Sequence, residues 1–254
     1  MGFDRDSHFK GWAKPGPLAP GAVADVDVPP AESLDAISGH FRIFQLRKGH
    51  RFSTDDVLTA WYGTAWAPTV HWMLDLGSGI GSVGMIAAWR LPGARVVTVE
   101  AQDDSVRLAR KSAAYNGLEH RYEIRHADFR AANALRPDER FDLVLGSPPY
   151  FPPGTGIEGD HPQKVACRFE LRGDIRDYAA VAAARLSAGG LFACVFPDEQ
   201  RQRVEDAARL AALTIVRRRP VVFREGEPPL VIRTSDGSVH PEYAAVKLSV
   251  GFPP

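Results

Sequence analysis

A glycine-rich turn between an apolar strand and an apolar helix constrains this chain more than any other feature. Residues 72–76 form a short apolar run that leads into the turn 77–81, and an apolar helical pattern follows as far as Trp89. Glycine permits positive φ and lets a ligand approach the backbone closely. The helix that follows presents free N–H groups and the positive end of its dipole. The sequence therefore predicts an α/β fold with a ligand-binding turn at a helix start.

A second strand continues the nucleotide-binding pattern. Residues 95–99 follow a Pro-Gly turn and end at Glu100. An acidic residue at the tip of a second strand is where a ribose diol is bound in such sheets. Residues 79–84 also satisfy G-x-G-x-x-G, the fingerprint of dinucleotide sites. This fingerprint does not separate NAD from other adenosine-bearing cofactors, so an NAD-binding oxidoreductase is one interpretation.

A stiff turn ends another apolar strand. Residues 141–146 run directly into Ser147-Pro148-Pro149-Tyr150. The two prolines fix φ and donate no N–H, so the carbonyls of Ser147 and Pro148 face outward as acceptors. Tyr150 adds a flat apolar face with a polar tip. The same residues would also suit a plain strand-ending turn, and the glycine-rich turn upstream is what favours a site that holds a planar amino group.

The glycine-rich turn carries a family resemblance. The stretch Asp75-Leu76-Gly77-Ser78-Gly79-Ile80-Gly81 resembles the D-x-G-x-G-x-G motif of class I S-adenosylmethionine-dependent methyltransferases. The resemblance implies S-adenosylmethionine as the cofactor, with its methionine part against this loop and its ribose hydroxyls on Glu100. Asp128 and Phe129, after a third strand over 122–126, would then bind the adenine. Asp128 could instead cap a helix over 131–134. The cofactor-binding residues implied are Asp55, Asp75, Gly77, Ser78, Gly79, Gly81, Glu100, Asp128 and Phe129.

The proline-rich turn extends the resemblance. A glycine-rich loop, an acidic strand end and [Asn/Asp/Ser]-Pro-Pro-Tyr together resemble the amino-group methyltransferases. The resemblance implies that the Ser147 side chain and the Pro148 carbonyl accept hydrogen bonds from the nitrogen to be methylated, while Tyr150 stacks on its planar group. Catalysis would come from positioning the nitrogen, and no general base is required. The catalytic residues implied are Ser147, Pro148, Pro149 and Tyr150.

Flanking segments narrow the family. Residues 41–60 and 240–243 are similar to segments of bacterial tRNA adenine-N6 methyltransferases that act beside the valine-tRNA anticodon. The similarity covers residues of about 41–250 and implies adenine N6 of RNA as the target. It also places Asp55 over the methionine end of the cofactor. Ser53 and Asp56 have in addition the spacing of a helix capping box.

Three departures leave the acceptor open. Ser147 stands where the tRNA family has Asn, His50 stands where it has Tyr, and the loop over 151–169 is long. A hydroxyl reaches less far than a carboxamide. A DNA base, a protein glutamine amide or a small amine shares the planar N–H₂ geometry and remains an alternative acceptor. A catalytically silent cofactor-binding module is a further alternative.

Composition gives no strong electrostatic signal. Lys and Arg number 31, as do Asp and Glu, so the net charge is zero and the basic excess of a nucleic-acid-binding protein is absent. One basic group beside the expected substrate entrance is the place to look for RNA contact: Lys164, Arg168, Arg172 and Arg176. Two Cys and eight His without paired spacing predict neither a disulfide framework nor a metal site.

The remaining pattern predicts one main domain. Residues 1–38, rich in Pro, Gly and Ala, indicate a poorly ordered arm before a methyltransferase domain over 39–254. Strands alternate with helices and are then followed by strands alone, which predicts a doubly wound, mostly parallel seven-stranded sheet with an antiparallel edge. Without a secretion signal or a membrane-length apolar run, the cytoplasm is expected, and nothing indicates an oligomeric state. The late elements expected are helices over 102–116, 174–187 and 198–212 and strands over 191–196, 213–217, 221–223, 230–233 and 245–250.

Overall fold

A parallel sheet forms the centre of the molecule. The computed structural model describes residues 8–9, 12–13, 26–67, 69–155, 161–222 and 230–252. Within these ranges the central sheet has five strands in the order β7-β6-β5-β8-β9, and every pairing is parallel. The strands are β5 (Trp72–Leu76), β6 (Arg95–Glu100), β7 (Tyr122–His126), β8 (Phe141–Gly146) and β9 (Leu186–Cys194).

The strand order creates a crevice at one edge of this sheet. From β5 the chain steps outward to β6 and β7, then returns to pair β8 with the other side of β5. Ligands of open α/β sheets bind where the order reverses in this way, at the carboxyl ends of the strands. The interior strands are mostly apolar because both faces of the sheet are covered. The sheet thus places the ends of β5, β6 and β8 side by side.

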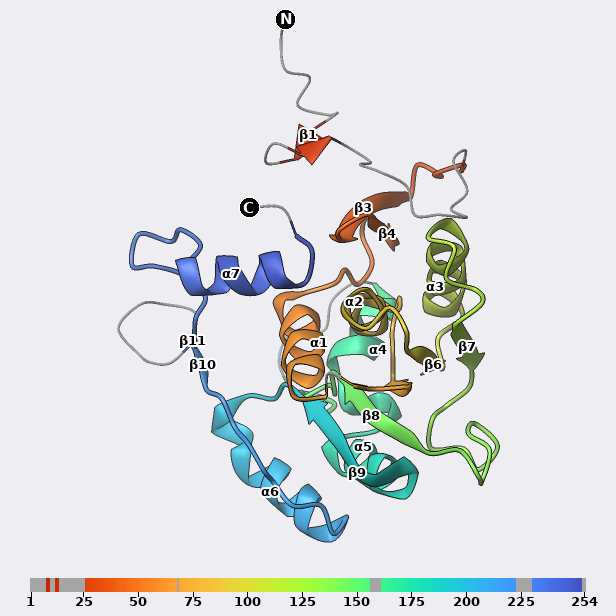
Figure 1. The fold of residues 1–254 in the computed structure, drawn as a ribbon, viewed down its shortest axis with the longest axis vertical. Coiled ribbons are helices and arrows are strands. Elements are labelled where there is room, and N and C mark those ends of the chain that lie inside the picture. The colour runs from red at the N-terminus through yellow and green to blue at the C-terminus, as the bar shows by residue number, and fades with distance from the viewer. Residues whose placement is uncertain are drawn as a thin grey trace, which may run out of the picture.

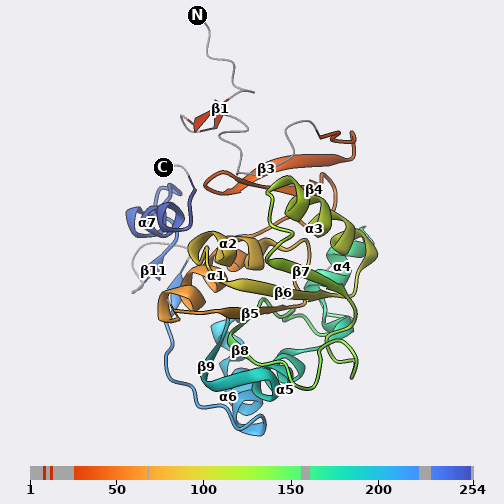
Figure 2. The same ribbon diagram turned by 45° about the vertical axis from the view of Figure 1, so that its right-hand side comes forward.

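Helices cover both faces (Figures 1 and 2). One face packs beneath α1 (Thr54–Trp66), α2 (Ser82–Arg90) and α3 (Asp103–Tyr115), and the opposite face beneath α5 (Ile175–Arg185), with α6 (Arg201–Leu210) beside it. Two main apolar cores result, one on each side of the sheet. Between β8 and α5 lie α4 (Pro162–Arg168) and the short 3-10 helix η1 (Glu170–Arg172), and before α6 lies a second one, η2 (Asp198–Gln200).

An antiparallel hairpin caps one end of the helical layer. Strands β3 (Glu32–Ser38) and β4 (Phe41–Leu46) pair with each other and lie against α3 (Figure 2). Ser112 on α3 accepts the backbone N–H of Phe44 through its hydroxyl at 2.9 Å. The prediction of a poorly ordered arm over residues 1–38 is therefore wrong for 32–38, because cross-strand bonds hold them. Most of the arm before residue 26 lies outside the described residues, apart from the short pair β1 (His8–Phe9) and β2 (Trp12–Ala13).

The predicted seven-stranded sheet with an antiparallel edge is wrong in the described ranges. Residues expected as the last strand, 245–250, lie mostly in α7 (Pro241–Ser249). Pro241 occupies the first turn of α7, and the His240 ring accepts the N–H of Glu242 at 3.2 Å, so local capping starts a helix there. Strands β10 (Val221–Val222) and β11 (Leu230–Val231) form a separate parallel pair. The predicted strand over 213–217 is irregular backbone, and residues 223–229 lie outside the described ranges.

Two smaller expectations also differ. The helix expected over 131–134 is a series of turns, and the helix expected to reach 187 stops at Arg185, where β9 begins. Across the described residues, none of the helices combines the length and apolarity needed to cross a bilayer.

Candidate functional site

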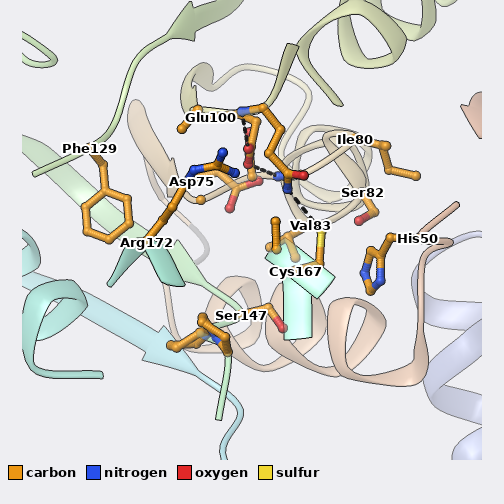
Figure 3. A pocket seen from close by; sticks show the side chains of 18 of the residues that line it. His50, Asp75, Ile80, Ser82, Val83, Glu100, Phe129, Ser147, Cys167 and Arg172 are labelled. Carbon is orange, nitrogen blue, oxygen red and sulfur yellow. Dashed lines mark hydrogen bonds between the residues drawn. The ribbon is translucent and has the colours of Figure 1, made fainter. Parts of the chain in front are cut away.

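A cavity of about 220 Å³ lies at the carboxyl ends of β5, β6 and β8. Figure 3 shows Glu100 and Ser147 entering it from opposite ends, with His50 on one side and Phe129 and Arg172 on the other. The glycine-rich turn and the proline-rich turn, which are far apart in the sequence, therefore line one cavity. Every predicted site residue except Gly81 lines it: Asp55, Asp75, Gly77, Ser78, Gly79, Glu100, Asp128, Phe129, Ser147, Pro148, Pro149 and Tyr150.

The glycine-rich loop needs its glycines for different reasons. Gly77 has a φ of +58°, and a Cβ there would lie 2.1 Å from the Tyr178 hydroxyl. Gly79 has a φ of +55°, yet a Cβ there would meet no atom within 4 Å, because its side faces the open cavity. Gly81 begins α2 in the left-handed region at +89° and stands outside the lining. Gly77 thus permits close packing, Gly79 leaves room for a ligand, and Gly81 starts the helix.

Glu100 ties the loop to the end of β6. Its carboxylate accepts the N–H of Gly79 at 2.8 Å through Oε2 and the N–H of Gln102 at 2.7 Å through Oε1. The residue is only 6% exposed, and its side chain lines the cavity. Each oxygen keeps a second lone pair, so the carboxylate can accept two hydroxyl groups of a ligand without releasing the loop.

Asp75 is buried with half of its carboxyl group unpaired. Oδ2 accepts the N–H of Gly84 at 2.8 Å, whereas Oδ1 has no hydrogen-bond partner within the described ranges. Burial raises the pKa of Asp75 well above its ordinary value, and the nearby carboxyls of Asp56 and Glu100 raise it further. Buried polar atoms are normally satisfied. An unpaired oxygen that lines a cavity therefore suits a ligand that brings a donor or a positive charge.

The start of α1 adds two more carboxyl groups. Asp56 accepts the N–H of Ser53 and the hydroxyl of Ser82, each at 3.0 Å, which confirms the predicted capping box and joins α1 to α2. Burial raises the pKa of Asp56 and of Asp55. Four carboxyl groups, from Asp55, Asp56, Asp75 and Glu100, thus surround one part of the cavity. A cation bound there would lower the pKa values of Asp55, Asp56 and Asp75 and stabilise their ionised forms.

The predicted Asp-aromatic pair lines the cavity from the segment that follows β7. Asp128 accepts the backbone N–H of Arg130 at 3.0 Å and its guanidinium at 2.6 Å, and the hydrogen bond from Arg130 is the main cause that lowers the pKa of Asp128. It therefore closes a turn and caps no helix. Phe129 is 6% exposed and packs edge-on against Tyr178 at 4.6 Å between ring centroids. The Phe129 ring gives this wall an apolar surface.

The proline-rich turn closes the cavity at the end of β8. Pro148 is buried, while Ser147 and Tyr150 are half-buried and line the space. The Tyr150 ring packs against Phe151 at 4.8 Å and edge-on against Phe196 at 6.1 Å. Burial raises the pKa of Tyr150, so its phenol stays neutral at physiological pH. The turn presents a hydroxyl and an aromatic ring across from the carboxyl groups.

Comparisons with known proteins agree with this arrangement. A family model described as the methyltransferase small domain matches residues 65–159. A tRNA1(Val) (adenine(37)-N6)-methyltransferase from Salmonella typhi is 28% identical over 217 residues, covering 77% of this chain and 86% of the relative. One from Salmonella enteritidis PT4 is 30% identical over 152 residues, 59% of each chain. These matches identify the chain as an S-adenosylmethionine-dependent methyltransferase.

Solved structures share the fold of this methyltransferase. A predicted O-methyltransferase from Agrobacterium tumefaciens superposes with a TM-score of 0.55 at 20% identity, covering 79% of this chain and 98% of that one. An S-adenosylmethionine-dependent methyltransferase from the same organism superposes with a TM-score of 0.50 at 16% identity, covering 72% and 59%. The fold assignment and the family assignment therefore agree, and the oxidoreductase interpretation of the glycine fingerprint is set aside.

The cavity of the methyltransferase fits its cofactor. S-adenosylmethionine carries a sulfonium and an ammonium group, and the unpaired Oδ1 of Asp75 and the neighbouring carboxyls suit positive charge. The open space beside Gly79 lets the cofactor approach the backbone. The Ser78 hydroxyl is also buried without a partner among the described atoms and offers a further polar contact.

Several residues of the methyltransferase cavity were not predicted as part of the site. His50 comes from the loop before α1, and its backbone N–H donates to Gln163 on α4 at 3.0 Å. Cys167 accepts a hydrogen bond from Gln102 at 3.3 Å, and burial raises the pKa of its thiol to about 12. No local pattern marks these side chains, because they reach the cavity only through the placement of α4 across it. The unpredicted lining includes His50, Gln102, Cys167 and Tyr178, whereas Arg168 and Arg172 belong to the basic group expected beside the substrate entrance.

Among the described residues, no three or more His, Cys, Asp or Glu side chains are placed so that they could hold a metal ion together.

Proposed function

We propose that this enzyme methylates N6 of an adenine in RNA, with tRNA as the substrate. The observation that carries the proposal is the meeting of Ser147 and Tyr150 with the glycine loop and Glu100 in one cavity. The relatives named as tRNA1(Val) adenine-N6 methyltransferases support the choice of acceptor.

The cofactor is assigned to the end of the cavity that holds the carboxyl groups. Glu100 takes the ribose hydroxyls, because its oxygens keep free lone pairs after binding two backbone N–H groups. Asp75 and Asp55 face the positively charged methionine end, with Gly77, Ser78 and Gly79 as the backbone surface. Asp128 and Phe129 hold the adenine, and Gly81 contributes by starting α2. When bound, S-adenosylmethionine supplies an electrophilic methyl group.

The acceptor is assigned to the turn after β8. The Ser147 hydroxyl and the Pro148 carbonyl accept hydrogen bonds from the amino group, and Pro149 keeps the turn rigid because its φ is fixed. Tyr150 stacks on the base. An amino nitrogen conjugated to a ring is a weak nucleophile, so holding its lone pair toward the methyl donor is the useful contribution of the chain.

Basic residues at the cavity mouth support a nucleic-acid acceptor. Arg168 and Arg172 line the cavity, and Lys164 lies one turn before Arg168 on α4. None of the three forms a salt bridge within the described ranges, whereas arginines such as Arg51, Arg125 and Arg203 are paired with carboxylates. The Arg168 guanidinium lies over the Phe151 ring at 5.5 Å. Unpaired cations beside a base-sized cavity suit contact with phosphates, which position a nucleic acid without reading its sequence.

The test is to supply methyl-labelled S-adenosylmethionine with tRNA, rRNA, DNA and protein fractions in parallel. We expect label in tRNA, and nucleoside digestion should place it in N6-methyladenosine. Label in DNA or in protein amides would show that the enzyme has a different acceptor but the same methyl-transfer chemistry. Cofactor binding without transfer to any fraction would indicate the silent module and contradict the proposal.

A further inference from the structure

A closed chain of hydrogen bonds holds the end of the proline-rich turn from outside the cavity. The Gln200 side chain donates to the backbone carbonyl of Tyr150 at 3.0 Å and accepts from Arg203 at 2.6 Å. Arg203 donates its other terminal nitrogen to Glu170 at 2.5 Å, and the Glu170 N–H donates to the Phe151 carbonyl at 3.0 Å. The series of hydrogen bonds starts at the carbonyl of Tyr150, the last residue of the turn, and ends at the carbonyl of Phe151, the residue after it.

The same arginine also supports the aromatic packing of Tyr150. The Arg203 guanidinium lies over the Phe196 ring at 5.6 Å, and Phe196 packs edge-on against Tyr150, with 78° between the ring planes. Arg203 therefore acts on Tyr150 by two routes, through Gln200 to its backbone and through Phe196 to its ring. These contacts join α6 and η1 to the turn after β8.

The burial of this network makes it stronger than a surface ion pair. The Glu170 side chain is 9% exposed and that of Arg203 is 28% exposed. Charge-assisted bonds that are shielded from water hold their geometry better than exposed pairs, which contribute little. Gln200, Arg203 and Glu170 do not line the cavity, so they have no direct contact with anything bound there.

We propose that Gln200 and Arg203 are positioning residues that hold Tyr150 and the adjacent acceptor carbonyls in the geometry required for methyl transfer. This inference rests on the proposed function of Tyr150. Reacting groups displaced by about 1 Å can lose a large part of the rate. Phe151, which follows Tyr150, also lines the cavity, and the network holds its carbonyl as well.

The decisive variant is Gln200→Glu. A carboxylate of the same shape still accepts from Arg203, but it cannot donate to the Tyr150 carbonyl. The matched control is Gln202→Glu, two residues further on in the first turn of α6, where the exposed side chain donates a hydrogen bond to Asp206 at 3.4 Å. Arg203→Lys keeps the charge but can reach only one of Gln200 and Glu170 at a time. We therefore expect a smaller rise in hydrogen exchange and a smaller loss of kcat than in Gln200→Glu.

Two measurements are made on each variant. Hydrogen exchange of the peptide over residues 150–155 in the free enzyme should accelerate about fivefold in Gln200→Glu and not in the control. The kcat for methyl transfer should fall about tenfold or more, with the dissociation constant for S-adenosylmethionine and the melting temperature unchanged.

The outcomes separate this inference from the proposed function. Unchanged exchange in Gln200→Glu overturns the positioning role, whatever the acceptor is. Faster exchange with unchanged kcat also overturns it, because the turn would then tolerate the motion. Faster exchange with reduced transfer to an acceptor other than RNA supports the positioning role while contradicting the proposed substrate.

Discussion

Asp75 links the stability of the free enzyme to the cofactor site proposed for it. Its carboxyl group is 1% exposed, lies near other carboxyls and leaves Oδ1 unpaired among the described atoms. A buried polar group without a partner costs about 1–3 kcal/mol. A positively charged cofactor would remove that cost, so the binding energy and the stability of the free enzyme are linked at this position.

Asp75→Asn should stabilise the free enzyme at neutral pH and weaken cofactor binding. The pKa of Asp75 is raised in the folded state, so folding favours its protonated form. The stability contributed by protonated Asp75 is present below its unfolded pKa and is lost as pH rises through the folded pKa. The variant carries no charge, so its melting temperature should exceed that of wild type increasingly as pH rises from 4 to 8.

Thermal unfolding over this pH range, with and without S-adenosylmethionine, measures both effects. A melting temperature that falls equally for wild type and variant as pH rises would contradict the buried-charge interpretation. Unchanged cofactor affinity in the variant would contradict the assignment of Asp75 to the cofactor.

Tyr150→Ala should lose methyl transfer and keep cofactor binding. Stacking of an aromatic side chain on a base contributes about 1–3 kcal/mol, which corresponds to roughly a tenfold to hundredfold loss of kcat/KM. Tyr62→Ala is the matched control, since Tyr62 packs against Trp61 and Trp66 on α1, away from the cavity lining. Single-turnover transfer and calorimetry measure the two quantities. Equal loss of transfer and of cofactor affinity would contradict the stacking role.

Among the elements, the loop between β5 and α2 is constrained from both of its sides. Gly77 packs against the Tyr178 hydroxyl from α5, while the Gly79 N–H is held by Glu100 from β6. The loop therefore depends on contacts from two other elements as well as on its own backbone freedom. These contacts hold its shape before any cofactor arrives.

Gly77→Ala should destabilise the loop more than any other single methyl group added there. Its φ of +58° is strained for alanine, and the new methyl group would lie 2.1 Å from the Tyr178 hydroxyl. Backbone strain of this kind costs about 1–3 kcal/mol, to which the clash adds. Gly93→Ala is the control, because a Cβ at Gly93 meets nothing within 4 Å and its φ lies outside the positive region. Denaturant unfolding gives the comparison, and equal losses in both variants would be evidence against the packing argument.

Element prediction failed where local chemistry outweighed the pattern. Residues 245–250 alternate in a way that favours a strand, but Pro241 and the His240 cap start a helix four residues earlier. The strand expected over 213–217 has no partner strand in the described ranges, because the exposed edge beyond β9 is not paired with it. Strand formation needs a neighbour, and a single segment does not reveal which neighbour it has.

For the molecule as a whole, a net charge of zero conceals an uneven distribution. Asp55, Asp56, Asp75 and Glu100 line the cavity together with Arg168 and Arg172, and Lys164 lies one turn before Arg168 on α4. The acidic and the basic groups cancel in the net charge, so the net charge reveals neither group. The arrangement matches a ligand whose cationic part lies deep in the cavity and whose anionic backbone stays outside it.

Lys164→Ala should weaken tRNA binding and reduce its salt dependence. Each phosphate contact that is removed lowers the slope of log K against log salt by about one. Arg209→Ala is the control, since Arg209 is exposed on α6 and pairs with Asp206. Fluorescence anisotropy with labelled tRNA at several salt concentrations gives the slopes. Equal slopes for Lys164→Ala and wild type would contradict phosphate contact at α4.

The sequence by itself determined the family chemistry, because the residues that carry it are consecutive. The run from Asp75 to Gly81 and the run from Ser147 to Tyr150 each lie at the end of one strand, and parallel strands bring their carboxyl ends to a common edge. Only the tertiary structure decided the rest of the cavity. His50 and Cys167 reach it from a loop and a short helix, and the network of Gln200, Arg203 and Glu170 joins residues that are 50 and 33 positions apart. Contacts of that kind depend on how the elements pack, and no local pattern of residue types encodes them.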